Sequence, residues 1–141
     1  MKLAITGLNH KTAPVEVREK LAIPENLLPQ ELARLKSRSG ISEGLILSTC
    51  NRVEVAVAVA DQENPREPLL DFLLGCSGNG LEREALAPHL YTHEGPDAIR
   101  HLFRVASSLD SMVVGEPQIL GQLKDAYAIA KETGASIDEI K

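Results

Sequence analysis

Residues 44–60 read GLILSTCNRVEVAVAVA, and the two strands that this segment predicts organise the rest of the chain. Its second half, residues 52–60, places valine at every other position, which is the period-two pattern of a β-strand. Residues 44–48 form a second short apolar run, and only the tripeptide 49–51 separates the two. So short a connection predicts a β-hairpin with Cys50 at its tip.

The segments on either side of the hairpin complete an α+β pattern. Periodicity and Pro and Gly boundaries predict strands at 2–8 and 90–93 and helices at 14–20, 24–38, 65–74 and 81–87. This order is typical of the ferredoxin-like split βαβ fold, a four-stranded antiparallel sheet with helices on one face. Two amphipathic helices follow, at 96–109 and after Pro117, and pack on the sheet or on each other. We therefore expect a ferredoxin-like subdomain at 1–94 and a helical subdomain at 95–141.

The composition is that of a globular protein and narrows the classes of function. Of 141 residues, 43% are hydrophobic and 25% charged, and no apolar run is long enough to span a bilayer. Two cysteines form no disulfide framework and the N-terminus has no signal-peptide core, so we expect a cytoplasmic protein without a membrane partner. Only 3% of residues are aromatic and the net charge is −5, which argues against a broad basic or base-stacking surface.

The end of the chain predicts a longer protein. Residues 136–139 read SIDE, which matches the S-x-x-E capping box of a helix start, yet only two residues follow. We expect this chain to be the front of a larger protein, with a frayed tail as the alternative.

Cys50 is the first candidate for chemistry, because a hairpin tip leaves a side chain accessible and a thiolate is a strong nucleophile. Arg52 lies two positions further along and shares the strand face, where its guanidinium could favour the thiolate or bind a carboxylate. The alternative is that Cys50 is ordinary buried packing after the apolar run 45–47.

Four histidines and one helix start are further candidates for a functional site. The possible bases are His10, His89, His93 and His101, and each could equally be an ordinary boundary residue. No histidine pair has metal-ligand spacing, so we expect no metal site. The segment GEPQILGQ, residues 115–122, opens a helix with free backbone N–H groups, although it could also be a plain surface helix start. GCSGNG at 75–80 lacks the G-x-G-x-x-G order of a dinucleotide site.

Four motif blocks, in order along the chain, resemble glutamyl-tRNA reductase. They are GLNHKTAPVEVREKLA (7–22), STCNRVE (48–54), HLFRVASSLDS (101–111) and LDSMVVGEPQILGQLKDAY (109–127). The resemblance is to the N-terminal catalytic domain of that family, and it implies that the NADPH-binding Rossmann domain and the dimerisation domain are absent from this chain. Ser108 is a departure, because many members have glycine there.

The resemblance implies an NADPH-dependent oxidoreductase of tetrapyrrole (porphyrin) biosynthesis. Cys50 would attack the ester of glutamyl-tRNA(Glu), and the resulting thioester would be reduced to glutamate 1-semialdehyde without metal or flavin. It also implies that His101 is catalytic, by polarising the carbonyl or protonating the leaving group. The substrate-binding residues that it implies are Thr49, Asn51, Arg52, Ser111, Glu116, Pro117, Gln118 and Gln122.

For the full-length protein the resemblance implies a homodimer, with possible channelling to the aminomutase that uses the semialdehyde. The alternative function is a non-catalytic ligand-binding or interaction module, because the ferredoxin-like scaffold hosts many functions.

Overall fold

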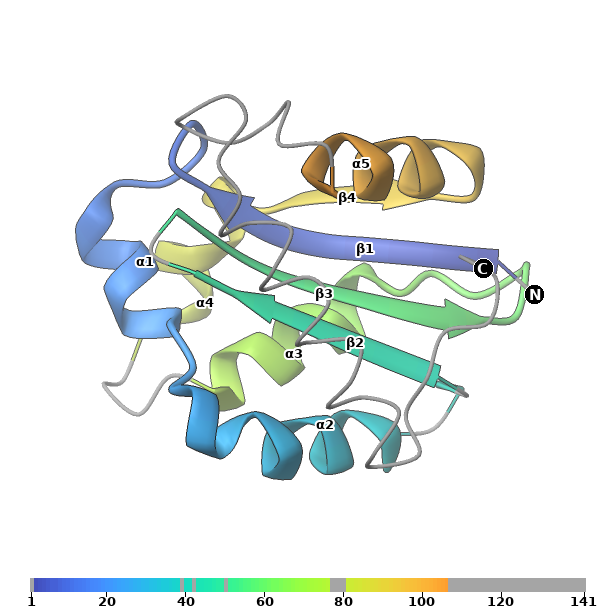
Figure 1. Cartoon of the computed structure of the whole chain (residues 1–141), viewed down its shortest axis with the longest axis horizontal. Coiled ribbons are helices and arrows are strands. Elements are labelled where there is room, and N and C mark those ends of the chain that lie inside the picture. Colours follow the sequence, from blue (N-terminus) through green and yellow to red (C-terminus); the bar gives the residue numbers. More distant parts are fainter. Residues whose placement is uncertain (1, 39, 42, 50, 77–80, 107–141) are drawn as a thin grey trace.

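The computed structural model describes residues 2–38, 40–41, 43–49, 51–76 and 81–106 (Figure 1). Cys50 and the expected helix after Pro117 lie outside the described residues, as do five predicted substrate-binding residues: Ser111, Glu116, Pro117, Gln118 and Gln122.

Four strands form one antiparallel sheet in the order β2-β3-β1-β4. The strands are β1 (Lys2–Asn9), β2 (Glu43–Ser48), β3 (Arg52–Val59) and β4 (Tyr91–Glu94). The helices are α1 (Val15–Leu21), α2 (Leu28–Lys36), α3 (Arg66–Cys76), α4 (Arg83–Leu86) and α5 (Pro96–Ala106), with 3-10 turns η1 (Glu25–Leu27) and η2 (Ala87–His89). This is the ferredoxin-like topology, so the predicted fold class is confirmed.

The helix expected at 24–38 is divided into η1 and α2. Pro29 lies in the first turn of α2, where its missing N–H leaves no hydrogen bond unmade. A proline at that position marks a helix start, so the regular helix begins at Leu28 rather than at Pro24.

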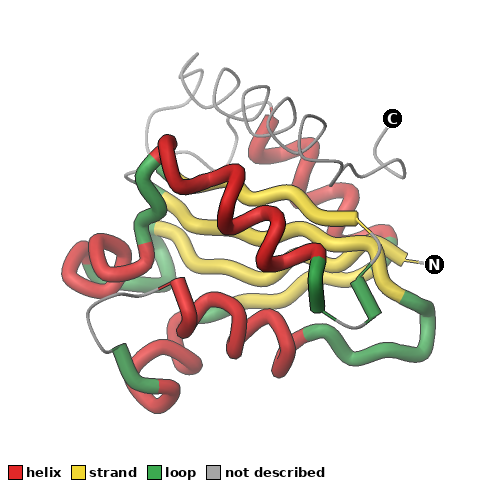
Figure 2. Tube along the Cα trace, turned by 90° about the horizontal axis from the view of Figure 1, so that it is seen from below, coloured by secondary structure: helices red, strands yellow, loops and turns green. Residues whose placement is uncertain are grey.

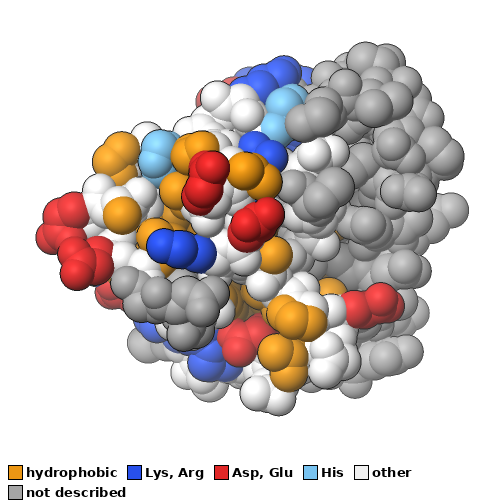
Figure 3. Space-filling view, turned by 90° about the vertical axis from the view of Figure 1, so that its left-hand side faces the viewer, with side chains coloured by type: hydrophobic (Ala, Val, Ile, Leu, Met, Phe, Trp, Pro, Cys, Tyr) orange, Lys and Arg blue, Asp and Glu red, His pale blue; other side chains and the backbone are white. Residues whose placement is uncertain are grey.

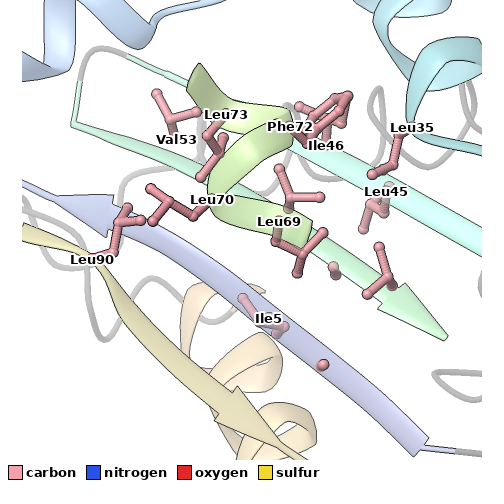
Figure 4. Close-up of a cluster of buried hydrophobic side chains, with 14 of the residues drawn as sticks. Ile5, Leu35, Leu45, Ile46, Val53, Leu69, Leu70, Phe72, Leu73 and Leu90 are labelled. Carbon is pink, nitrogen blue, oxygen red and sulfur yellow. The ribbon is translucent and has the colours of Figure 1, made fainter. Parts of the chain in front are cut away.

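β3 lies in the middle of the sheet and is buried along its whole length. Its valines, starting with Val53, point to the face covered by α3, whose Leu69, Leu70 and Leu73 pack around them (Figure 4). The residues between the valines, Glu54 among them, point the other way. We call this second side of the sheet the Glu54 face.

The helix expected at 96–109 packs on the sheet, which is one of the two placements that the sequence left open: α5 lies on the Glu54 face over β1 and β4 (Figures 1 and 2). Gly95, at φ +61°, forms the tight turn that carries the chain from β4 to this side, and its N–H donates to Leu3 O at 2.8 Å. Three side chains at helical spacing, Ala98, His101 and Val105, are buried beneath α5.

Candidate functional site

The β2–β3 hairpin tip is held by one side chain. Thr49 Oγ1 accepts hydrogen bonds from the backbone N–H groups of Asn51 at 3.0 Å and Arg52 at 3.1 Å. The Thr49 N–H donates to Arg52 O at 2.8 Å and closes the turn. Thr49 and Asn51 are half-buried, and Cys50 between them lies outside the described residues. Thr49, which the resemblance places against substrate, therefore also fixes the backbone on both sides of Cys50.

Arg52 points from the tip into the protein. Its side chain is 0% exposed, and its Nη1 donates to Glu54 Oε1 at 2.8 Å. The sequence indicated two uses of this guanidinium, favouring the Cys50 thiolate or binding a substrate carboxylate, and in the structure Nη1 binds a carboxylate of the chain itself. A guanidinium has five N–H donors, so this pairing with Glu54 uses only part of its capacity.

Glu54 is the centre of a buried polar cluster. Arg52 donates to Oε1, Tyr91 donates from its hydroxyl to Oε2 at 2.9 Å, and His101 Nε2 lies against Oε2. Burial alone would raise the pKa of Glu54, but the hydrogen bond and charge of His101 and the charge of Arg52 outweigh it and hold this pKa below its ordinary value. Glu54 is therefore an ionised carboxylate at neutral pH.

Three rings pack around the same carboxylate. His93 stacks on His101 with ring centroids 4.5 Å apart and an interplanar angle of 28°, and Tyr91 lies 5.3 Å from His101. His101 is only 3% exposed, whereas His93 is half-buried. Burial, followed by the electrostatic interaction with His101, lowers the pKa of His93. His93 is therefore neutral at neutral pH.

Gly7 makes room for Glu54. It pairs with Glu54 on β3 and with Tyr91 on β4, so it lies beneath the cluster. A Cβ at this position would stand 2.3 Å from Val53 O and 2.9 Å from Glu54 Cγ. Only glycine lets β1 run this close to the Glu54 side chain.

The loop after β1 lies at the same end of the sheet as the hairpin tip, because Asn9 pairs with Arg52. The Asn9 side chain accepts from the backbone N–H groups of Lys11 and Thr12. His89 Nδ1 lies 2.9 Å from Thr12 O, which ties this loop to η2. His89 thus has a structural contact, and it lies apart from the Glu54 cluster.

Of the residues that the sequence singled out, the structure gathers Arg52, His93 and His101 in one cluster. Sequence reasoning missed Glu54 and Tyr91. Glu54 carried a usable signal, because it is the one charged side chain within the alternating run 53–59. An acidic group inside an otherwise apolar central strand requires a buried partner.

The part of the chain that the structure describes lacks two kinds of feature. It contains no group of three or more His, Cys, Asp or Glu residues placed to hold a metal ion. None of its helices is both long and apolar enough to cross a membrane.

The surface at the α1 end of the molecule mixes acidic, basic and apolar side chains (Figure 3). Among the described residues on this face, the lysines and arginines are scattered and form no continuous basic field. This distribution agrees with the overall charge of −5.

The fold and the cluster together define an α+β domain of ferredoxin-like topology, with an Arg–Glu–His network buried behind a cysteine-bearing hairpin. The chain belongs to the glutamyl-tRNA reductase family, because the model of the family described as "Glutamyl-tRNAGlu reductase, N-terminal domain" matches residues 6–141. The predicted resemblance is thereby confirmed.

Individual relatives agree with the family match. The glutamyl-tRNA reductase of Solibacter usitatus is 62% identical over 135 residues, which are 96% of this chain and 32% of that protein. The Syntrophotalea carbinolica protein of the same name is 53% identical over 94% of this chain and 30% of its own length. The solved glutamyl-tRNA reductase from Methanopyrus kandleri matches with a TM-score of 0.73 and 33% identity, over 99% of this chain and 30% of that one. The chain thus spans about a third of the length of these relatives.

Proposed function

We propose that this chain is the thioester-forming part of an NADPH-dependent glutamyl-tRNA reductase of porphyrin biosynthesis. The observation that carries the proposal is the buried Arg52–Glu54–His101 network, whose Arg52 follows Cys50 by two positions in the sequence. An arginine–carboxylate–histidine chain behind a thiol is suited to acyl transfer, since it can orient groups and move protons away from bulk water.

In the proposed reaction, the Cys50 thiolate attacks the carbonyl carbon of the ester that joins glutamate to tRNA. A carbon–sulfur bond forms and the carbon–oxygen bond to the ribose breaks. The ribose oxygen leaves as a hydroxyl after it gains a proton. We assign His101 to carbonyl polarisation or to proton delivery at this step, and the product on the protein is a glutamyl thioester.

NADPH supplies the hydride that turns such an acyl group into an aldehyde. The residues of this chain do not fit that cofactor, because GCSGNG at 75–80 has the wrong glycine order and begins at the end of helix α3, whereas a dinucleotide loop follows a strand. We therefore assign NADPH binding, and the dimerisation that the resemblance implies, to the other two thirds of the longer relatives.

The remaining site assignments are proposals from the resemblance. We place glutamate and the acceptor end of tRNA against Thr49, Asn51 and Arg52 from the hairpin. The C-terminal part of the chain contributes Ser111, Glu116, Pro117, Gln118 and Gln122. We further propose a subdomain boundary near residue 94, a cytoplasmic homodimer, and transfer of the aldehyde to an aminomutase.

Thioester formation can be tested by mass spectrometry of the chain mixed with glutamyl-tRNA(Glu). We expect a glutamyl adduct on the wild-type protein and on a Cys76→Ser control, and none on Cys50→Ser, because a neutral serine hydroxyl is a far weaker nucleophile. An adduct on Cys50→Ser at the wild-type level would exclude Cys50 as the nucleophile. Absence of any adduct on the wild type, with tRNA binding intact, would favour a non-catalytic module.

The same reasoning predicts how the fragment behaves alone. We expect slow release of free glutamate from charged tRNA, because a thioester without its covering domain is open to water. We expect no aldehyde with NADPH, because this chain positions no hydride donor. NADPH-dependent aldehyde from the purified chain would contradict this division of labour.

A further inference from the structure

His101 is oriented by groups on two neighbouring strands. Its Nε2 lies against Glu54 Oε2 from β3, and its ring packs 5.3 Å from the Tyr91 ring of β4. The Tyr91 hydroxyl donates to the same Oε2 at 2.9 Å. The buried imidazole and carboxylate and the half-buried phenol therefore form one connected unit.

The chemistry of this unit allows one arrangement of protons. An ionised carboxylate can only accept hydrogen bonds. Arg52 donates to Oε1 and Tyr91 donates to Oε2, so the third group against Glu54 must also be a donor. His101 Nε2 therefore carries a proton, and in the neutral ring the basic lone pair belongs to Nδ1.

We propose that Glu54 is a positioning residue that holds His101 in the Nε2–H tautomer, that Tyr91 positions Glu54 against His101, and that thioester formation at Cys50 requires this tautomer. In this tautomer the Nδ1 lone pair can take the proton of the Cys50 thiol and then deliver it to the leaving ribose oxygen. The second half of the proposal rests on the proposed function, whereas the first half can be measured without any reaction.

Glu54→Gln gives the sharpest test, because Arg52 dictates which way the new amide points. Arg52 can only donate, so the glutamine oxygen must face Arg52 and the NH2 group must face His101. His101 Nε2 must then accept, which moves the ring proton to Nδ1. We expect this single substitution to invert the tautomer and to slow thioester formation about 100-fold, in the range of general acid–base effects.

Tyr91→Phe separates the hydroxyl from the ring. The ring contact with His101 stays and Glu54 stays ionised, so we expect the Nε2–H tautomer to persist and thioester formation to fall about tenfold, as for a hydrogen bond to a charged group. Thr92→Val is the matched control. It removes a hydroxyl from the next residue of β4, which faces the other side of the sheet, where Thr92 contacts Thr6 at 3.0 Å.

The measurement is the long-range 1H–15N spectrum of the histidine rings in the labelled chain at pH 8, with adduct formation followed in parallel. Wild type, Tyr91→Phe and Thr92→Val should show His101 protonated at Nε2, and Glu54→Gln should show it protonated at Nδ1. Thr92→Val should form thioester at the wild-type rate.

A wild-type His101 protonated at Nδ1 would overturn the proposal whether or not Glu54→Gln folds. So would an inverted tautomer in Glu54→Gln with a wild-type rate of thioester formation. If the wild type forms no thioester while the spectra match, the proposed function fails and the positioning of His101 stands.

Discussion

Replacing Gly7 with alanine should destabilise the protein more than the addition of a single methyl group suggests. The added Cβ would lie 2.3 Å from Val53 O and 2.8 Å from Glu54 Cα, both backbone atoms of the central strand. Ordinary contact begins at 3.4 Å, so β1 and β3 must separate locally by about 1 Å. Overpacking costs about 1–3 kcal/mol, and we expect the upper end because no side-chain rotation relieves a backbone clash. The melting temperature should fall by about 10 °C.

Gly44→Ala is the matched control for this experiment. Its Cβ would also make a close contact, at 2.7 Å, but with the Cδ2 atom of Leu35, which is the end of a flexible side chain. We expect Gly44→Ala to remain within about 1 kcal/mol of the wild type, because alanine also lowers the entropy of the unfolded chain. Thermal unfolding followed by circular dichroism compares the two. Equal melting temperatures for the two variants would refute the close-approach argument for Gly7.

Three further predictions concern the neighbouring groups. The pKa of His93 is lower in the folded protein than its ordinary value of 6.5. Just below pH 6.5 the unfolded chain therefore binds more protons than the folded protein, so the free energy of unfolding should fall as the pH drops from about 7.5 to about 5.5. His93→Asn should flatten this dependence in urea titrations, and an unchanged slope would contradict the argument. Burial, together with Glu31, raises the pKa of Cys76 to about 12, so iodoacetamide at pH 8 should modify Cys50 first, as peptide mapping would show. Thr49→Val should cost about 1–2 kcal/mol through two lost hydrogen bonds, whereas Thr49→Ser should keep them; equal stability of the two would disprove the role of the hydroxyl.

Local signals in the sequence were sufficient for the fold. The valine alternation of β3 and the three-residue gap before it predict a hairpin that needs no knowledge of distant residues. The placement of α5 was not predictable in this way. Its apolar stripe shows that one side is buried, but the side of the sheet it covers depends on the turn at Gly95 and on a partner 47 positions from His101.

The candidate site, like the fold, has one part that the local sequence predicts and another part that depends on contacts between distant residues. Cys50 and Arg52 attracted attention because their chemistry is visible in a short motif. Glu54 and Tyr91 act through a contact between residues 37 apart, and their roles follow from how β3 and β4 both pair with β1, which no local motif shows. Arg52 illustrates this, since a guanidinium near a thiol suggests a bound carboxylate, and the strand alternation that places residues 52 and 54 on one face also gives Arg52 the carboxylate of Glu54 as a partner.

The position of the cluster is itself an argument for function. Burying a charged pair gains little stability over a well-packed apolar replacement, since desolvation offsets most of the attraction between the charges. A sheet with β3 buried on both faces has no structural need for Arg52, Glu54 and His101 at its centre, and alanine or valine would fill the same alternation. The cluster also imposes a glycine on β1 opposite Glu54. What these residues provide is a histidine held in one orientation, with its proton fixed by a carboxylate that two other donors, Arg52 and Tyr91, anchor. Such preorganisation suits the proton transfer that we propose, whereas a module that only binds a partner would have no use for it.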